Sequence, residues 1–477
     1  MSNQVIDKNQ SRATLLGEER ILKLLIRFSG PAIVGMLVNA LYNFVDSLFI
    51  SRYVSPNALA GVTVSFPIML ISMAISMLIG IGSTSLLSIR LGEGKHDEGE
   101  KIIGNGVTLI VIFSATFSIL GLTFLTQLLR IFGVTGDALP YARDYLSIIL
   151  WGNVFSSVGF SMNNYIRAEG SPKIAMYTML IGAVINIGLD ALFIIPLGWG
   201  VKGGALATII SQFISMIWVL SYFLTGRSSL KIHAKNLRLN FKYVILIIKL
   251  GAAPFFLQLA AALMNTVLNV SIREYGGELA TTYQASIGAV SRISTLLLMP
   301  LFGINQGAQP IIGFNYGAKK YDRVREALKL AIVFATGIVL IGYLITRFFP
   351  SILINMFIDK DADYDPQLFI EYGKKAIFAY YFFMPVVGYQ IIGANFFQAI
   401  GKPIKAATLS LSRQLLFLIP LILVLPIYFK NVLEQNPVNG IVWSIPSADV
   451  LSTILTTFLL IYELRLIKKQ ESELSYR

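Results

Sequence analysis

Two aspartates lie inside apolar stretches of this 477-residue chain, where a charged side chain is costly. Asp46 interrupts NALYNFVDSLFI, and Asp190 interrupts INIGLDALFIIP together with Asn186. Asn186 and Asp190 are four residues apart, so on a helix they share one face. Two carboxylates in a partly desolvated cavity can take up a proton, hold Na⁺ or face a cationic ligand. These residues therefore predict coupling to a proton or another cation.

The composition is typical of a membrane protein. Hydrophobic residues make up 55% of the chain and charged residues only 14%, against about 25% charged residues in ordinary globular domains. Many apolar runs exceed the roughly 20 residues that span a bilayer as a helix, and they lack the alternation of barrel strands. The net charge of +13 is then expected in membrane-flanking loops, with no nucleic-acid partner. The absence of cysteine excludes disulfides and thiolate chemistry.

About twelve spans are predicted from the apolar runs and their Gly, Pro and basic breaks. Their approximate limits are 22–50, 57–88, 102–128, 140–166, 173–196, 204–225, 243–272, 279–312, 328–350, 368–399, 405–429 and 440–464. With both termini in the cytoplasm, inner segments hold 27 Lys and Arg and outer segments hold 10. This excess predicts that both termini are cytoplasmic and that odd-numbered spans run outward.

The chain also repeats itself. LIRFSGPAIVGMLVNALYNFVDSLFI aligns with LIIKLGAAPFFLQLAAALMNTVLNVSI, and NNYIRAEGSPK aligns with ANFFQAIGKPI, placing Gly170 on Gly401. IRLGEGKHDEGEKI resembles GFNYGAKKYDRVREAL in the same order. We expect an all-α integral membrane protein whose two pseudo-symmetric six-helix bundles surround a central cavity. The predicted parts are the N-terminal bundle (1–225), a cytoplasmic linker (226–242) and the C-terminal bundle with its tail (243–477).

The repeat indicates that the helical fold does not itself require these aspartates. Asp46 aligns with Asn269, while Asn186 and Asp190 align with Phe417 and Leu421. The second half then offers a polar inventory that is expected to be free of acids. The acidic site is accordingly predicted to belong to the first half alone.

Depth in the membrane predicts which side chains meet. Asp46 lies six residues before Arg52, and Asp190 lies six residues before Pro196, where the fifth span is expected to end. Thr208, on the inward-running sixth span, follows Lys202 by six residues. Six residues of helix correspond to roughly 9 Å. The predicted coupling site, with possible Na⁺ binding, therefore consists of Asp46, Asn186, Asp190 and Thr208. Candidate substrate-binding residues are Asn39, Tyr42, Asn43, Tyr145, Asn163 and Met179, and Pro31 is a predicted helix bend.

Over nearly its whole length the sequence resembles the multidrug and toxic compound extrusion family. The resemblance rests on twelve spans in two halves, the Gly-x-Pro turns after spans 4 and 10, and the LGEGKHDE and YGAKKYDR loops. Asp46, Asn186, Asp190 and Thr208 resemble the first-half cation site of its DinF-like branch. The resemblance implies a monomeric, multi-pass transporter in a prokaryotic inner membrane. It implies antiport, in which H⁺ or Na⁺ enters while an amphipathic, often cationic drug leaves, with no other cofactor.

A flippase for lipid-linked oligosaccharides, which belongs to the same larger group, is the alternative function. Arg292 and Arg413, inside predicted spans, would suit it. A membrane enzyme is disfavoured because the chain has no HExxH motif, phosphate loop or plausible nucleophile triad. The sequence thus favours an acid-coupled transporter over both of these classes.

Overall fold

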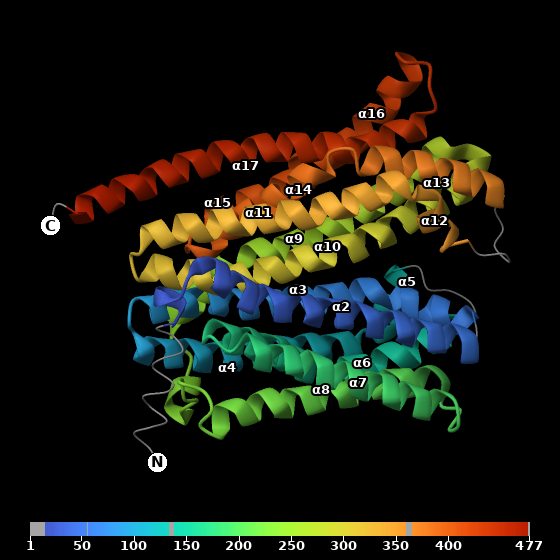
Figure 1. Cartoon of the computed structure of the whole chain (residues 1–477). Helices are drawn as coiled ribbons and strands as arrows, with labels where there is room; N and C mark the ends of the chain where they lie inside the picture. The colour runs from blue at the N-terminus through green and yellow to red at the C-terminus, as the bar shows by residue number, and fades with distance from the viewer. Residues whose placement is uncertain (1–14, 55, 133–137, 359–364, 476–477) are drawn as a thin grey trace.

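The computed structural model describes residues 15–54, 56–132, 138–358 and 365–475. Every regular element within them is helical, and the helices stack side by side along one direction (Figure 1). The first half contains α2 (Ile21–Tyr53), α3 (Pro56–Gly92), α4 (His96–Thr123), α5 (Leu125–Ile131), α6 (Ala138–Ala168), α7 (Pro172–Ile194) and α8 (Gly200–Leu224). The short η1 (Ala234–Leu237) lies in the expected linker.

The second half is less regular than the first. It contains α9 (Phe241–Gly276), η2 (Gly277–Leu279), α10 (Ala280–Gly317), α11 (Tyr321–Phe348), α12 (Pro350–Asn355), α13 (Pro366–Tyr380), α14 (Met384–Ala399), α15 (Pro403–Leu411), the π-helical η3 (Ser412–Leu418), α16 (Ile419–Asn431) and α17 (Pro437–Ser475). Figure 1 shows α2–α8 in one stack and α9–α17 in the other. The exact domain boundaries remain a prediction.

Twelve spans are accommodated by these helices. Among the described residues, ten helical runs are long and apolar enough to cross a membrane, or eleven when the bent pair α13 and α14 forms one span. One run, 241–317, contains both α9 and α10 and so holds two of the expected spans. The all-α membrane fold predicted from the sequence is confirmed.

Two spans are irregular where the sequence places proline. The tenth is bent by 52° between α13 and α14, just before Pro385 in the first turn of α14. The eleventh widens into η3, directly before Pro420 in the first turn of α16. Proline lacks the N–H that continues a helix, and its ring crowds the preceding turn. Both deviations therefore have a local cause.

The repeat predicted from the sequence reappears in the loop geometry. Gly170 and Gly401 both have left-handed backbone, with φ of 92° and 77°, and each precedes a helix that begins with proline. The loops after α3 and α10 match likewise, since Gly94 and Lys319 have φ of 74° and 57°. Equivalent turns thus connect equivalent helices in the two halves.

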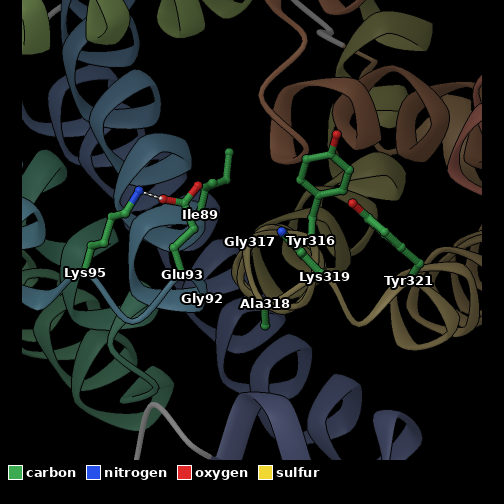
Figure 2. Close-up of a pocket in the computed structure, with 9 residues that line it drawn as sticks. All are labelled: Ile89, Gly92, Glu93, Lys95, Tyr316, Gly317, Ala318, Lys319 and Tyr321. Atoms are coloured by element: carbon green, nitrogen blue, oxygen red, sulfur yellow. Dashed lines mark ion pairs between the residues drawn. The ribbon is translucent and has the colours of Figure 1, made fainter. Parts of the chain in front are cut away.

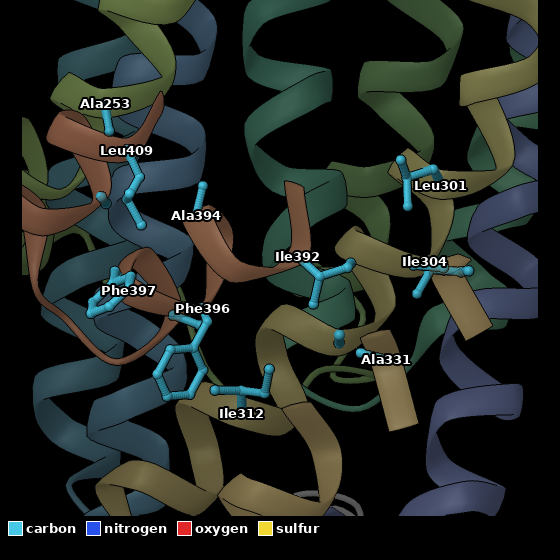
Figure 3. Close-up of a cluster of buried hydrophobic side chains, with 14 of the residues drawn as sticks. Ala253, Leu301, Ile304, Ile312, Ala331, Ile392, Ala394, Phe396, Phe397 and Leu409 are labelled. Carbon is cyan, nitrogen blue, oxygen red and sulfur yellow. The ribbon is translucent and has the colours of Figure 1, made fainter. Parts of the chain in front are cut away.

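Apolar side chains from several helices fill the second half. Figure 3 shows α14 inserting aromatic and aliphatic side chains among its neighbours. The labelled members of this cluster are Ala253, Leu301, Ile304, Ile312, Ala331, Ile392, Ala394, Phe396, Phe397 and Leu409, all buried. They come from α9, α10, α11, α14 and α15, so these helices share one core.

Glycines bring the halves together near the end where α2 begins and α17 ends, which we call the terminal end (Figure 1). A Cβ on Gly251 of α9 would lie 1.7 Å from the Leu78 carbonyl oxygen of α3, and one on Gly82 would lie 2.2 Å from the Ile247 carbonyl oxygen. Such distances leave no room for a side chain. The segments of α3 and α9 nearest the terminal end therefore pack backbone against backbone.

Replacing Gly251 by alanine is expected to lower the stability of the protein by about 1–3 kcal/mol, the usual cost of overpacking. The added methyl group must push α3 and α9 apart, because a carbonyl oxygen rather than a flexible side chain blocks it. Thermal unfolding of the purified protein measures the effect. Gly337→Ala on α11 is the matched control, since nothing lies within 4 Å of its added Cβ. Equal melting temperatures for the two variants would contradict this packing argument.

A buried carboxylate anchors the start of the linker. Glu169, in the turn between α6 and α7, is 1% exposed and accepts hydrogen bonds from Tyr222 (3.1 Å) and Ser228. Tyr222 also donates to Ser171 (3.1 Å). Burial raises the pKa of Glu169 to about 7 from an ordinary value of 4.5, although the hydrogen bonds from Ser228 and Tyr222 oppose the rise. Glu169 therefore holds its proton more tightly when the protein is folded.

The direction in which pH changes the stability follows from the difference in proton affinity between the folded and unfolded states. Because the folded state holds this proton more tightly, the stabilisation is complete below the unfolded pKa of 4.5 and is lost as pH rises through about 7. Glu169→Gln is expected to flatten the fall in melting temperature between pH 5 and pH 8. Thermal unfolding across that range checks it, with the exposed Glu371→Gln as the control. If melting temperature falls with pH as steeply in Glu169→Gln as in the wild type, other titratable groups determine the pH dependence of stability.

Candidate functional site

Asn186, Asp190 and Thr208 meet between α7 and α8. Asn186 and Asp190 lie one turn apart on α7, and they are 1% and 0% exposed. The Asn186 amide donates to the Thr208 hydroxyl of α8 over 3.4 Å. The structure thus brings together three of the four residues predicted for the coupling site, and both helices bury them.

Asp46 reaches the same place from α2. A Cβ on Gly204 would lie 3.3 Å from the Asp46 Oδ1 atom, so the glycine leaves room for this carboxylate against α8. Gly204 precedes Thr208 by one helical turn. The charges of Asp46 and Asp190 are near enough to interact. Three helices therefore converge on one polar site, as their equal depth in the sequence predicts.

Four carboxylate and amide oxygens of this site have no protein partner among the described residues. Among the described residues, Asp46 Oδ1, Asn186 Oδ1 and both Asp190 carboxylate oxygens are buried without a hydrogen bond, and neither aspartate pairs with Lys or Arg. Burying an ionised carboxylate without a partner costs several kcal/mol. A proton removes this cost, and a cation coordinated by oxygen offsets it. The all-oxygen set fits Na⁺, a hard cation that prefers such ligands.

An aromatic and aliphatic shell surrounds the carboxylates. Tyr145 of α6 is 3% exposed and packs in a cluster with Ile50, Ile194 and Val201. Tyr145 and Tyr42 both lie within electrostatic range of Asp46 and Asp190. The predicted residues Tyr42 and Tyr145 are therefore placed beside the acids, where an apolar wall strengthens electrostatic interactions.

The remaining predicted substrate residues divide into two groups. Asn39 and Asn43 are hydrogen-bonded to each other along α2, with the Asn43 amide 2.7 Å from the Asn39 carbonyl oxygen, and both side chains keep solvent exposure. Asn163 and Met179 instead contact Arg167. Met179 precedes Asp190 by eleven residues, about 16 Å of helix. The structure does not bring Asn163 and Met179 to the carboxylates.

Arg167 was missed by sequence reasoning, which counted it with the basic residues of an inner loop. It is 6% exposed at the end of α6 and donates to Asn163 and to Gln306 of α10. Its guanidinium thus joins the two halves near the terminal end. The signal was present in NNYIRAEG, where the arginine directly follows an apolar and amide-rich run.

The expectation that the polar inventory of the second half is free of acids is wrong. Asp449 of α17 lies 2.6 Å from the Arg413 Nε atom, and Glu463, 0% exposed, pairs with Lys402 and with Lys405 (2.6 Å). Asp449 lies in PSADVLSTIL within a predicted span, so the sequence contained the signal. These second-half acids have basic partners, whereas Asp46 and Asp190 have none among the described residues. This contrast marks the first-half acids as available to a mobile cation.

The other arginine considered from the sequence, Arg292, lies exposed on α10 without an ion-pair or hydrogen-bond partner among the described residues. The helix α2 continues through Pro31 without interruption. A bend at Pro31 that changes during function stays a prediction.

Comparison with known proteins gives a consistent result. The family model MatE matches residues 31–192 and 254–424, one segment in each half. The multidrug export protein MepA of Staphylococcus haemolyticus (strain JCSC1435) is 26% identical over 459 residues, covering 94% of this chain and 95% of its own. MepA of Staphylococcus aureus (strain N315) is 24% identical over 446 residues, covering 93% and 94%.

Solved structures agree with these relatives. A ligand-bound structure of the MATE multidrug transporter DinF-BH is 40% identical, with a TM-score of 0.83, and the match covers 94% of this chain and 96% of that one. An outward-facing conformation of a multidrug resistance MATE family transporter is 24% identical, with a TM-score of 0.87 and coverage of 96% and 99%. Because the outward-facing structure is only 24% identical, it supports the fold alone.

Proposed function

This chain belongs to the MatE family, and from that premise we propose that it exports amphipathic, often cationic drugs in exchange for H⁺ or Na⁺. A multidrug efflux transporter of this family is not an enzyme. The observation that carries the proposal is the pair Asp46 and Asp190, whose buried oxygens lack any cationic partner among the described residues. Their contrast with the paired acids of the second half argues against a purely structural role.

Competition for the carboxylates would couple the two fluxes. One proton or Na⁺ bound at Asp46 and Asp190 removes one of the two negative charges, and the less negative site attracts a cationic drug less than the fully ionised site does. Each ligand shifts the balance between the two access states by its difference in affinity for them. A site that accepts either the ion or the drug, but not both, therefore couples inward ion movement to outward drug movement.

Broad drug specificity is supported by the surroundings of the site. The half-buried Tyr42 offers a stacking surface, and the half-buried Asn39 and exposed Asn43 offer a few adaptable hydrogen bonds. Such a lining accepts differently shaped amphipathic molecules, because few fixed polar contacts must be satisfied. Asp46 and Asp190 would supply the preference for cations.

Alternating access is supported by a difference between the two ends. At the terminal end, Gly92 and Gly317 let α3 and α10 touch, since their added Cβ atoms would lie 2.0 and 2.1 Å from the Phe314 and Ile89 carbonyl oxygens. Toward the other end, the polar side chains Asn43 of α2 and Asn265 of α9 remain exposed. We take this to be the state that opens to the outside. The proposal includes a monomer in the prokaryotic inner membrane with both termini in the cytoplasm.

Uptake of a fluorescent organic cation into inverted vesicles tests the proposal. A proton gradient and a sodium gradient are imposed separately. Transport driven by one gradient and not by the other identifies the coupling ion. An uptake rate that is the same with and without each gradient would contradict antiport.

A further inference from the structure

A pocket lies away from the carboxylates, at the terminal end between the two halves (Figure 1). Its volume is about 550 Å³. Figure 2 shows Glu93 and Lys95 of the α3–α4 loop on one side, and Tyr316, Lys319 and Tyr321 at the α10–α11 loop on the other. The remaining lining residues are Ile89, Gly92, Gly317 and Ala318. The pocket is thus made jointly by equivalent loops of the two halves.

Closure of the terminal end creates this pocket. Gly92 meets the Phe314 carbonyl and Gly317 meets the Ile89 carbonyl, and these contacts are reciprocal because each glycine takes the same place in its half. Separation of α3 from α10 would break both contacts and pull apart the two walls of the pocket. A molecule that fits the pocket therefore binds the closed state better than a state in which this end is open.

Lys319 is held in an unusual backbone conformation at this place. Its φ is 57°, in the left-handed region that disfavours side chains, whereas its equivalent in the first half is a glycine, Gly94, with φ of 74°. The second half thus retains a lysine where the turn favours glycine. Strained residues of this kind gather at functional sites, where the side chain itself is needed.

The neighbouring lysines are already engaged. Lys95 pairs with Glu93 (2.7 Å), Lys320 donates to the Gly17 carbonyl (2.9 Å), and Lys402 and Lys405 hold Glu463. The Lys319 side chain has no ion-pair or hydrogen-bond partner among the described residues. Of these lysines at the closed end, Lys319 is the one whose ammonium group is available to a ligand.

We propose that this pocket binds a phosphoester anion, presented by the head group of an anionic lipid, and that binding holds the terminal end closed. Lys319 supplies the charge, and the hydroxyls of Tyr316 and Tyr321 supply hydrogen-bond donors. Ile89 and Ala318 provide apolar contact. The pocket lies where α3 and α10 end and α4 and α11 begin, which is the depth of lipid head groups when these helices span a membrane.

Spin-label distances test this inference directly, because the chain has no native cysteine. Lys101→Cys on α4 and Glu326→Cys on α11 place labels at exposed, equivalent positions of the two halves. The labelled full-length protein is placed in nanodiscs of phosphatidylcholine, with or without 30 mol% phosphatidylglycerol. We expect phosphatidylglycerol to raise the ratio of closed to open populations by roughly fivefold, the effect of about one lysine at an anionic surface.

Three variants make the test specific. Lys319→Gln removes the charge and is expected to reduce the lipid effect below about twofold. Lys319→Gly removes the charge and the backbone strain together, so it folds at least as well and should give the same loss. Lys329→Gln, an exposed α11 lysine outside the pocket, should keep the full effect. A full lipid effect in both Lys319 variants would overturn the proposal.

Glycerol 3-phosphate, added to nanodiscs of phosphatidylcholine alone, separates the two sources of the anion. No shift in the label distance is expected, because the soluble anion lacks the acyl chains that concentrate it at this depth. A shift equal to that of phosphatidylglycerol would overturn the assignment to a lipid. This inference rests on the proposed alternation of access, but the two are tested by different measurements. An absence of gradient-driven drug transport, together with an intact lipid effect on the label distance, would contradict the transport proposal alone.

Discussion

Asp46→Asn and Asp190→Asn are each expected to reduce gradient-driven drug uptake by at least tenfold, which is roughly 1.4 kcal/mol of lost coupling. Asparagine keeps the shape of the side chain and can still coordinate weakly, but it cannot be ionised or take up a proton. The site then cannot change charge between ion-bound and drug-bound states. Uptake of a fluorescent cation by proteoliposomes, under the gradient that drives the wild type, measures this loss.

The matched control lies at the equivalent position of the other half. Asn269 aligns with Asp46 in the repeat, and its side chain is exposed. Its backbone carbonyl accepts a hydrogen bond from Gln284 over 3.1 Å, which a change of side chain leaves in place. Asn269→Ala is therefore expected to change uptake by less than about twofold. Full gradient-driven uptake in both aspartate variants would refute the assignment of coupling to this site.

Asp449→Asn is expected to destabilise the protein by about 3–5 kcal/mol, the usual cost of removing one member of a buried ion pair. Arg413, within the π-helical segment η3, would keep its charge after losing the carboxylate that lies 2.6 Å from its Nε atom. Unfolding of purified protein in detergent, followed by heat or denaturant, measures the change. Arg413 is partly exposed, so water can reduce the loss toward the lower value.

The same substitution at Asp190 should act in the opposite direction. Asp190 is fully buried and its oxygens have no hydrogen-bond partner among the described residues, so a neutral amide removes a desolvation cost without breaking an ion pair. Asp190→Asn is expected to raise the melting temperature in the absence of Na⁺ and at neutral pH or above, while Asp449→Asn lowers it. Equal destabilisation by both would mean that Asp190 is a structural residue of the bundle.

Much of the architecture could be predicted from local sequence. Apolar runs longer than a bilayer crossing specify helices, because hydrocarbon leaves backbone groups no other partner. The repeat placed Gly170 on Gly401, and both residues adopt left-handed turns before a helix that starts with proline. The bend of the tenth span and the π-helical η3 were not anticipated, because the spans were identified by hydropathy, which does not register how Pro385 and Pro420 interrupt backbone hydrogen bonding.

The convergence of the four coupling residues could be predicted from their depth in the membrane. Asp46, Asn186, Asp190 and Thr208 converge because α2, α7 and α8 pack together and their spans begin and end at common levels. Asn163 and Met179 contact Arg167 and lie away from the carboxylates, and their assignment to substrate binding stays a prediction. Amide and methionine side chains have many structural uses, so residue type alone does not place them at a ligand.

The sequence by itself determined the membrane class, the duplicated helices and the restriction of the Asp46 and Asp190 pair to one half, because composition, periodicity and alignment are properties of the chain. Only the tertiary structure decided which acids have partners. Arg413 meets Asp449 across 36 residues, and Lys402 meets Glu463 across 61, whereas Asp46 and Asp190 meet no cation among the described residues. Electrostatic pairing depends on distances of a few ångströms in space, and such distances arise only when the helices pack.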